Sequence, residues 1–336
     1  MSQIEKQSAL RHGDLVEGNI DEVFARYYEE KAIYQTRPAQ TLTRLSNIKS
    51  WLNVKFLSEI NEPIISQMVA KIRKEFKNAT VNRYLALLSV VLNTAKDEWH
   101  YNCNHIKISK FKLPEPAENV KYIKDSETIK KIVDRAPPHF KPLIITAVNT
   151  GLRLGNLLKL KWENVDFSND LITVKVKCRN KDGGKNHSVP MIPEVKKVLQ
   201  TIPQISEYVF LSSNNKPIKF IQTTWCDIFY KWQIVKDLDT LTSDDVLYRK
   251  KYKRKDGTEK TLTYKRVLKD VNLPYVNFHV LRHTTGTWLA KANVNAKVIK
   301  DTLGHEDIRT TNKYMHAADS DKRAALNAVF SNDSSN

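Results

Sequence analysis

Four short motifs between residues 150 and 314 constrain this chain more than any other feature. They are Thr150-Gly-Leu-Arg153, His279-Val-Leu-Arg282, Leu303-Gly-His305 and the single residue Tyr314. Each side chain taken alone is more often an ordinary core or surface residue. In this order and spacing, two arginines, two imidazoles and a phenol suit one task. They can hold a phosphodiester, spread its developing charge and attack it with an oxygen nucleophile.

The local sequence predicts how these motifs are presented. The apolar run 142–148 predicts a helix that ends before Gly151, and this glycine permits a tight turn that directs Arg153 towards a ligand. His279 and Arg282 are three residues apart, so they would share one face of a helix. These expectations place the basic groups at element ends, where they can converge.

The charge balance indicates a polyanionic partner. The 336 residues carry 55 Lys and Arg against 37 Asp and Glu, a formal net charge of +18. Each phosphate that such a surface neutralises releases a condensed counterion, which favours nucleic acid as the partner. Charge alone would also fit a ribosome-associated protein or one at a membrane surface.

Composition predicts a soluble, cytoplasmic protein associated with DNA, with no membrane partner. Cys103, Cys178 and Cys226 are far apart, odd in number and without a CxxC pair, which argues against a disulfide framework or a zinc site. No apolar run approaches the ~18 residues that span a bilayer, and the first residues lack a signal-peptide core. The sequence contains no metal-ligand cluster, and we expect no metal or cofactor.

Hydrophobic periodicity divides the chain into two domains. Residues 1–18 are polar and predict a flexible arm, whereas 19–103 repeat apolar positions at three-to-four spacing, which predicts about four helices. In 104–121, lysines alternate with apolar residues ahead of two prolines, which predicts an extended basic linker. Beyond the helix expected near Asn19, the predicted helices cover 39–54, 64–76 and 80–99.

Residues 122–336 predict a second domain, mainly helical with a small β component. Alternating residues in 171–193 predict a β-hairpin that turns at Asp182-Gly183. A further basic β-hairpin is predicted as an insertion at about 246–269, because ten Lys or Arg accompany only two acidic residues there. The end of the chain predicts a short C-terminal helix at about 319–330.

Taken together, Thr-Gly-Leu-Arg, His-x-x-Arg-His-Thr, Leu-Gly-His and the tyrosine closely resemble the tyrosine recombinases, the lambda-type phage integrase family, from about residue 19 to 330. The resemblance implies a helical, SAM-like core-binding domain and a mixed α/β catalytic domain that clamp duplex DNA. It implies a site-specific recombinase that works through a 3′-phosphotyrosyl intermediate, with integration or excision of a phage or mobile element as the favoured role. The sequence leaves a Xer-like resolvase, a DNA invertase, a type IB topoisomerase and a non-catalytic DNA-binding regulator as alternatives.

The resemblance also implies a role for each motif residue. Tyr314 is the nucleophile that attacks the scissile phosphate. Arg153 and Arg282 bind the non-bridging oxygens, for which the planar guanidinium offers paired donors. His279 and His305 add hydrogen bonds or assist proton transfer.

A lysine on the first hairpin should protonate the leaving 5′-oxygen. Lys181 is our choice, and Lys177 and Lys185 are alternatives because the turn is one residue longer than common family versions. The sequence departs from the family at Asn156 and Val280, where acidic supporting residues usually stand. These departures put in doubt the rate and the protonation of neighbouring groups more than the reaction class.

Residues outside the reaction centre are expected to contact DNA, and the family implies a homotetramer on two DNA sites. The C-terminal helix would dock on a neighbouring subunit, and the need for accessory DNA-bending or directionality factors is left open. The basic insertion would contact DNA or a neighbouring subunit, or form a solvated loop. The DNA-contacting candidates are Thr80, Asn82, Arg83, Lys107, Lys110, Lys250, Lys251, Lys253 and Arg254.

Overall fold

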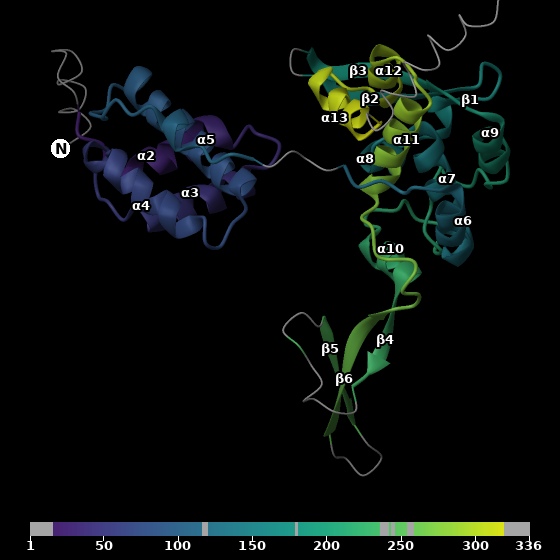
Figure 1. Cartoon of the computed structure of the whole chain (residues 1–336). Helices are drawn as coiled ribbons and strands as arrows, with labels where there is room; N and C mark the ends of the chain where they lie inside the picture. Colours follow the sequence, from purple (N-terminus) through teal and green to yellow (C-terminus); the bar gives the residue numbers. More distant parts are fainter. Residues whose placement is uncertain are drawn as a thin grey trace, which may run out of the picture. The chain divides into compact units, whose positions relative to one another are not determined.

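The structure, a computed structural model, describes residues 16–115, 120–178, 181–235, 242, 246–253 and 259–318 (Figure 1). The chain forms two compact units, Met1–Ala117 and Glu118–Asn336. The division lies inside the interval 104–121. Most of the predicted arm, together with the predicted helix 319–330, lies outside the described residues.

The first unit is helical, in agreement with its hydrophobic periodicity. Asn19 caps one helix by accepting from the Asp21 amide at 2.9 Å, and Asn61 caps another by accepting from the Ile64 amide at 3.0 Å. The buried faces repeat every three to four residues, as along α5 at Val81, Leu85, Leu88, Val91, Leu92 and Ala95. Its helices are α2 (Ile20–Tyr27), α3 (Pro38–Leu52), α4 (Glu62–Ile72) and α5 (Asn78–Asp97), with shorter turns at Tyr28–Ala32, Leu57–Glu59 and Ile108–Phe111.

The first part of the predicted linker packs on this unit instead of extending freely. Ile108 is buried, and Ile106, Phe111 and Leu113 are partly buried against the same core. Asn82 on α5 donates to the Leu113 carbonyl and accepts from the Leu113 amide, both at 2.9 Å. The apolar residues that alternate with the lysines therefore anchor this stretch, because they pack against the core of the first unit.

The second unit is built mainly from helices, with two small antiparallel sheets (Figure 1). Its core centres on the apolar helix α7 and on α11, where Leu143, Ile144 and Leu281 are fully buried. The helices are α6 (Ser126–Arg135), α7 (Lys141–Thr150), α8 (Leu154–Leu157), α9 (Pro193–Gln200), α10 (Gln222–Phe229), α11 (His279–Lys291), α12 (Ala296–Leu303) and α13 (Arg309–Ala318), with 3-10 turns at Pro138–Phe140 and Trp162–Asn164. The predicted fold class, mainly α with a small β component, is confirmed.

The first sheet has the order β1-β2-β3, with β1 (Val165–Asp166), β2 (Leu171–Cys178) and β3 (Lys181–Pro190). Ile172 pairs with Val189, and Cys178 pairs with Lys181 after a register shift between Val176 and Cys178. The predicted turn at Asp182-Gly183 was therefore placed too late in the sequence. Because strand pairing already begins at Lys181, after the irregular step, Asp182 and Gly183 belong to β3.

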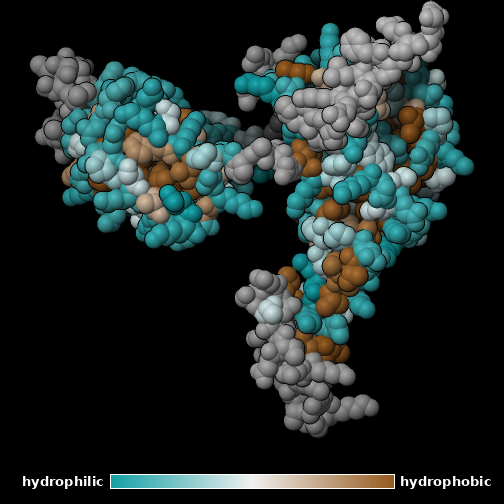
Figure 2. Space-filling model, in the orientation of Figure 1, coloured by the Kyte–Doolittle hydropathy of each residue, from teal (hydrophilic) through white to brown (hydrophobic). Residues whose placement is uncertain are grey.

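The basic insertion is a three-stranded sheet of order β4-β6-β5. The predicted hairpin supplies β5 (Leu247–Lys253) and β6 (Glu259–Leu268), and β4 (Tyr230–Ile234) joins the other edge of β6. Apolar and polar residues alternate along Tyr230–Ile234, which suits a strand. Hydrophobic surface shows on this sheet (Figure 2), where Trp232 and Ile234 are nearly half exposed.

Among the residues that the structure describes, no helix combines the length and apolar character required to cross a membrane.

Candidate active site

The chain brings its four motifs together around the first turns of α11. Arg153 follows α7, His305 follows α12, and Tyr314 lies on α13, which contacts both α11 and α12. His279 and Arg282 occupy the first turn of α11. Five of the six residues expected at the reaction centre therefore converge, although residues 153 and 314 are far apart in the sequence.

Arg282 is held deep in this cluster and is 3 % exposed. Its Nη1 donates to the Gly151 carbonyl and its Nη2 to the Leu303 carbonyl, both at 2.6 Å. Burial, followed by the positive charge of Arg153, lowers the pKa of Arg282 to about 10, and Tyr314 opposes this shift. The guanidinium therefore stays charged at neutral pH, and backbone dipoles compensate its charge.

The C-terminal end of α12 is bound by three basic side chains. The successive carbonyls of residues 302, 303 and 304 contact His187 Nε2 at 3.1 Å, Arg282 Nη2 at 2.6 Å and Arg153 Nη1 at 3.3 Å. A helix C-terminus carries partial negative charge, so cationic donors are favourable there. These bonds tie both arginines to the turn that carries His305.

Gly304 makes this turn possible. Its φ of +62° lies in the left-handed region, which ends α12 in the usual glycine conformation. A Cβ at this position would lie 2.9 to 3.1 Å from ring atoms of His187. The glycine thus serves both the backbone turn and the close approach of His187.

Tyr314 is buried in this cluster, with a side chain 1 % exposed. Its hydroxyl lies 2.9 Å from Nδ1 of His283, and its ring stacks on the His305 ring, with centroids 6.0 Å apart and planes 13° apart. Arg153 and Arg282 both interact electrostatically with this tyrosine. The phenol oxygen therefore lies among imidazoles and beside two guanidinium groups.

Both imidazoles that flank Tyr314 are neutral at physiological pH. Burial, followed by the charges of Arg282 and Arg153, lowers the pKa of His305 to about 3, and its Nδ1 lies 2.8 Å from Thr311 Oγ1. Burial lowers the pKa of His283 to about 4, with His279 as the next cause. Neutral rings of this kind can accept a proton as well as donate one.

Sequence reasoning did not assign roles to His283 and His187. His283 directly follows Arg282 in the His-x-x-Arg-His-Thr motif. This neighbouring position on the predicted helix was the sequence signal for a place near the site. His187 lies on β3, and burial and the two nearby arginines lower its pKa. Only the tertiary arrangement brings His187 to the end of α12.

The hairpin lysines are placed unequally. Lys181 opens β3 opposite Cys178, and Lys177 lies near the end of β2. Lys185 is exposed and lines a pocket together with His187 and His305.

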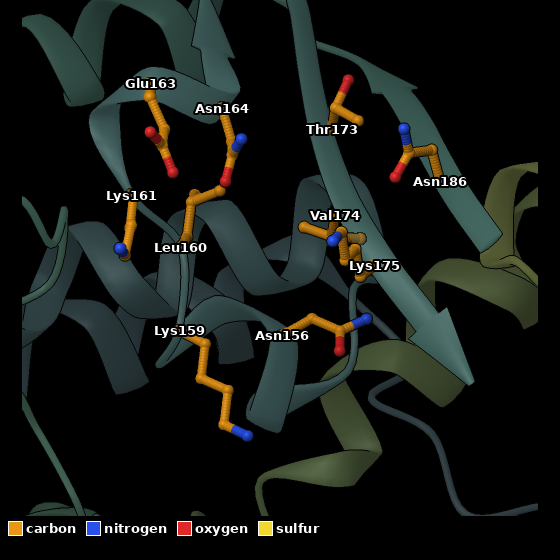
Figure 3. A pocket seen from close by; sticks show the side chains of 10 residues that line it. All are labelled: Asn156, Lys159, Leu160, Lys161, Glu163, Asn164, Thr173, Val174, Lys175 and Asn186. Atoms are coloured by element: carbon orange, nitrogen blue, oxygen red, sulfur yellow. The ribbon is translucent and has the colours of Figure 1, made fainter. Parts of the chain in front are cut away.

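The two departures from the family pattern have different surroundings. Val280 is 1 % exposed within the hydrophobic core. Asn156 lines a pocket beside the first sheet, together with Lys159, Lys175 and Asn186 (Figure 3). The carbonyls of Gly151 and Leu303 contact Arg282 and supply negative dipoles to its guanidinium.

The candidate DNA contacts of the first unit differ in accessibility. Arg83 and Lys107 are exposed, Thr80 is half-buried, and Lys110 is paired with Glu62 at 2.9 Å. Asn82 uses its amide for Leu113 and for Glu115, at 2.7 Å from the carboxylate. On the insertion, Lys250, Lys251 and Lys253 lie on β5, and Arg254 lies outside the described residues.

Comparison with known proteins identifies the family of the chain. The model of the phage integrase family matches residues 122–321. The tyrosine recombinase XerC-like protein of Caldanaerobacter subterraneus subsp. tengcongensis is 26 % identical over 286 residues, which are 81 % of this chain and 71 % of that protein. The integrase of Salmonella phage P22 is 22 % identical over 86 % of this chain and 67 % of its own length.

Solved structures share the fold. The Tn1549 transposon integrase in complex with a circular intermediate DNA superposes with a TM-score of 0.64 at 18 % identity, over 93 % of this chain and 99 % of that one. A lambda integrase dimer bound to a COC′ core site has a TM-score of 0.63 at 17 % identity, over 92 % and 80 %. The chain therefore belongs to the phage integrase family and is a site-specific recombinase of the tyrosine type, an enzyme that cleaves and rejoins DNA.

Proposed function

We propose that this recombinase uses Tyr314 to exchange DNA strands at the integration site of a phage or other mobile element. The convergence of four separate segments on the Tyr314 hydroxyl and the adjacent arginines carries the proposal. The named relatives include the P22 integrase and the ICEBs1 integrase of Bacillus subtilis, which supports the integrase role. A Xer-like resolvase is the second candidate, because the XerC-like and XerA recombinases are also similar.

In the proposed reaction, Tyr314 Oη attacks the scissile phosphorus. A bond from phosphorus to this oxygen forms while the bond to the 5′-oxygen breaks, which leaves a 3′-phosphotyrosyl link. Arg153 and Arg282 stabilise the negative charge on the non-bridging oxygens, and His279 and His305 add hydrogen bonds. Because the covalent link conserves the phosphodiester energy, a new 5′-hydroxyl can reverse the step without ATP.

A hairpin lysine supplies the proton of the leaving 5′-oxygen in this scheme. We retain Lys181 because it opens β3 beside the hairpin tip. Lys185 is the competing candidate, since it lines the same pocket as His305. A substrate with a bridging 5′-sulfur needs no proton on its leaving group, so it should restore cleavage to the variant that lacks the true acid.

The proposed partners are double-stranded DNA and three further copies of the chain. The proposed location is the cytoplasm, where the protein would be associated with DNA. Lambda integrase has been solved as a dimer on a core site and as a tetramer bound to a Holliday junction, at TM-scores of 0.63 and 0.59. The charge of +18 suits a clamp on duplex DNA. We propose that 319–330 docks on a neighbouring subunit, and that accessory DNA-bending or directionality factors assist some reactions.

Covalent trapping tests the proposed function and finds the target sequence in the same experiment. The full chain is incubated with a library of nicked duplexes of randomised sequence, and the adducts that survive denaturing detergent are recovered and sequenced. We expect one enriched sequence, lost with Tyr314→Phe and retained with the control Tyr208→Phe. A two-site plasmid that carries this sequence should recombine. Relaxation of supercoils without recombination would instead indicate a topoisomerase, and DNA binding without adducts would indicate a regulator.

A further inference from the structure

The hydroxyl of Tyr314 has an imidazole partner other than His279 and His305, the two histidines to which the family resemblance gives a role. His283 Nδ1 lies 2.9 Å from Tyr314 Oη, which is hydrogen-bond distance. His305 stacks on the tyrosine ring and directs its own Nδ1 to Thr311. His279 is exposed at the start of α11 and lies edge-on to His283, with ring centroids 4.6 Å apart. The geometry singles out His283 as an imidazole at the nucleophilic oxygen itself.

Gly286 fixes this arrangement from one turn further along α11. A Cβ on Gly286 would lie 2.8 to 3.0 Å from three atoms of the Tyr314 ring, closer than real Cβ atoms approach. His283 and Gly286 are three residues apart and share a helix face. The tyrosine ring therefore rests directly on the α11 backbone, and this contact brings its hydroxyl to His283.

The surroundings of His283 keep its ring in the neutral form, which has a ring nitrogen free of a proton. The ring is half-buried, and the charged or titratable groups around it include His279 and Arg282 on α11, Lys313 on α13, and His305. These groups favour the neutral imidazole, which offers one ring nitrogen as an acceptor. A hydroxyl donor at 2.9 Å from Nδ1 implies the tautomer with its proton on Nε2.

We propose that His283 is the general base for Tyr314. The Tyr314 hydroxyl passes its proton to His283 Nδ1 as Oη attacks phosphorus, while the leaving 5′-oxygen is protonated separately. In the reverse step, a 5′-hydroxyl attacks the phosphotyrosyl link, and the departing phenolate regains the proton from the His283 imidazolium. Arg153 and Arg282 beside the tyrosine place the phosphate next to the same oxygen. This inference rests on the proposed cleavage by Tyr314.

Single-turnover cleavage by the full chain tests the proposal, with the nicked duplex that the wild-type protein enriches as the probe. General bases contribute roughly 10²- to 10⁴-fold, so His283→Ala should lower the rate of adduct formation by about 10²-fold or more. DNA binding, measured by fluorescence anisotropy, should stay close to wild type. The matched control His105→Gln changes an exposed histidine of the first unit and should cleave normally.

Two chemical substitutions distinguish a base from other roles. A fluorinated tyrosine at position 314 ionises more readily, so it should raise the rate of His283→Ala by a larger factor than that of the wild type. A bridging 5′-sulfur in the DNA should leave the His283→Ala defect in place, because it relieves only the leaving group. Restoration by the sulfur substrate, or a cleavage rate for His283→Ala near or above wild type, would overturn the proposal.

Gly286→Ala provides a second variant that should keep the fold, since alanine favours a helix over glycine. Its Cβ should displace the Tyr314 ring and reduce adduct formation at least tenfold, with DNA binding retained. Unchanged cleavage would contradict the role of this contact. Absence of any Tyr314 adduct with the wild-type chain would instead refute the proposed function, so the two failures are distinguishable.

Discussion

The two arginines of the site should differ sharply in what their loss does to stability. Arg282 is 3 % exposed and donates to two backbone carbonyls at 2.6 Å, whereas Arg153 is exposed and donates to the Gly304 carbonyl at 3.3 Å. We therefore compare Arg282→Gln with Arg153→Gln. Both substitutions should abolish cleavage, because each removes a charged donor to the phosphate.

The magnitude follows from the hydrogen bonds of Arg282. Bonds to a charged group contribute about 1.5–3 kcal/mol each, and two would be lost or weakened in Arg282→Gln. The variant also avoids the cost of burying a guanidinium, which reduces the net loss to about 2–4 kcal/mol. For a unit of this size, 1 kcal/mol shifts Tm by about 2–4 °C, so we expect a decrease of roughly 5–15 °C. Arg153→Gln should stay within about 0.5 kcal/mol of wild type.

Differential scanning calorimetry of the full chain can measure this contrast. The first unit supplies an internal reference, because neither substitution touches it. We expect only the transition of the second unit to move, and only in Arg282→Gln. Equal shifts in Tm in the two variants, or a larger shift in Arg153→Gln, would refute the view that Arg282 stabilises the fold in addition to binding the phosphate.

Three further predictions concern pH, salt and assembly. His305 and His283 have folded pKa values of about 3 and 4, below the unfolded value of about 6.5, so stability should be lost as pH falls below 6.5. The loss at pH 5 should reach about 2 kcal/mol from His305, and urea unfolding of His305→Gln should show a shallower slope with pH. Neutralising the basic residues of the insertion should flatten the salt dependence of DNA binding in an ionic-strength titration, and an unchanged slope would exclude phosphate contacts there. The residues to change are Lys250, Lys251, Lys253 and Arg254. Deleting 319–336 should impair the pairing of two sites in a gel-shift assay more than single-site binding, whereas normal strand exchange would refute docking in trans.

Local patterns were enough to predict the helices and most of the residues that converge around α11. Apolar spacing gave the helices of the first unit, and the order of the motifs located Arg153, Arg282 and Tyr314. These features depend on neighbours within a few residues, or on short sequences with specific chemistry. The sequence therefore predicted the fold class and most of the residues that converge.

What the sequence could not predict depends on contacts between distant segments. Strand β3 begins at Lys181, ahead of the predicted turn, and its pairing with β2 shifts register between Val176 and Cys178. Asn82 was expected at DNA, yet its amide contacts Leu113 and Glu115 across more than 30 residues. The arginines bind backbone carbonyls at the end of α12. Every residue has a backbone carbonyl, so the sequence does not show which ones the arginines contact.

The most direct test of the central claim is the chemical identity of the residue that joins DNA. The trapped adduct can be digested with nuclease and protease, and the peptide that carries the remaining nucleotide identified by mass spectrometry. We predict a 3′-phosphodiester linkage to Tyr314, abolished in Tyr314→Phe. A nucleotide on any other residue, or an adduct that persists in Tyr314→Phe, would contradict the account.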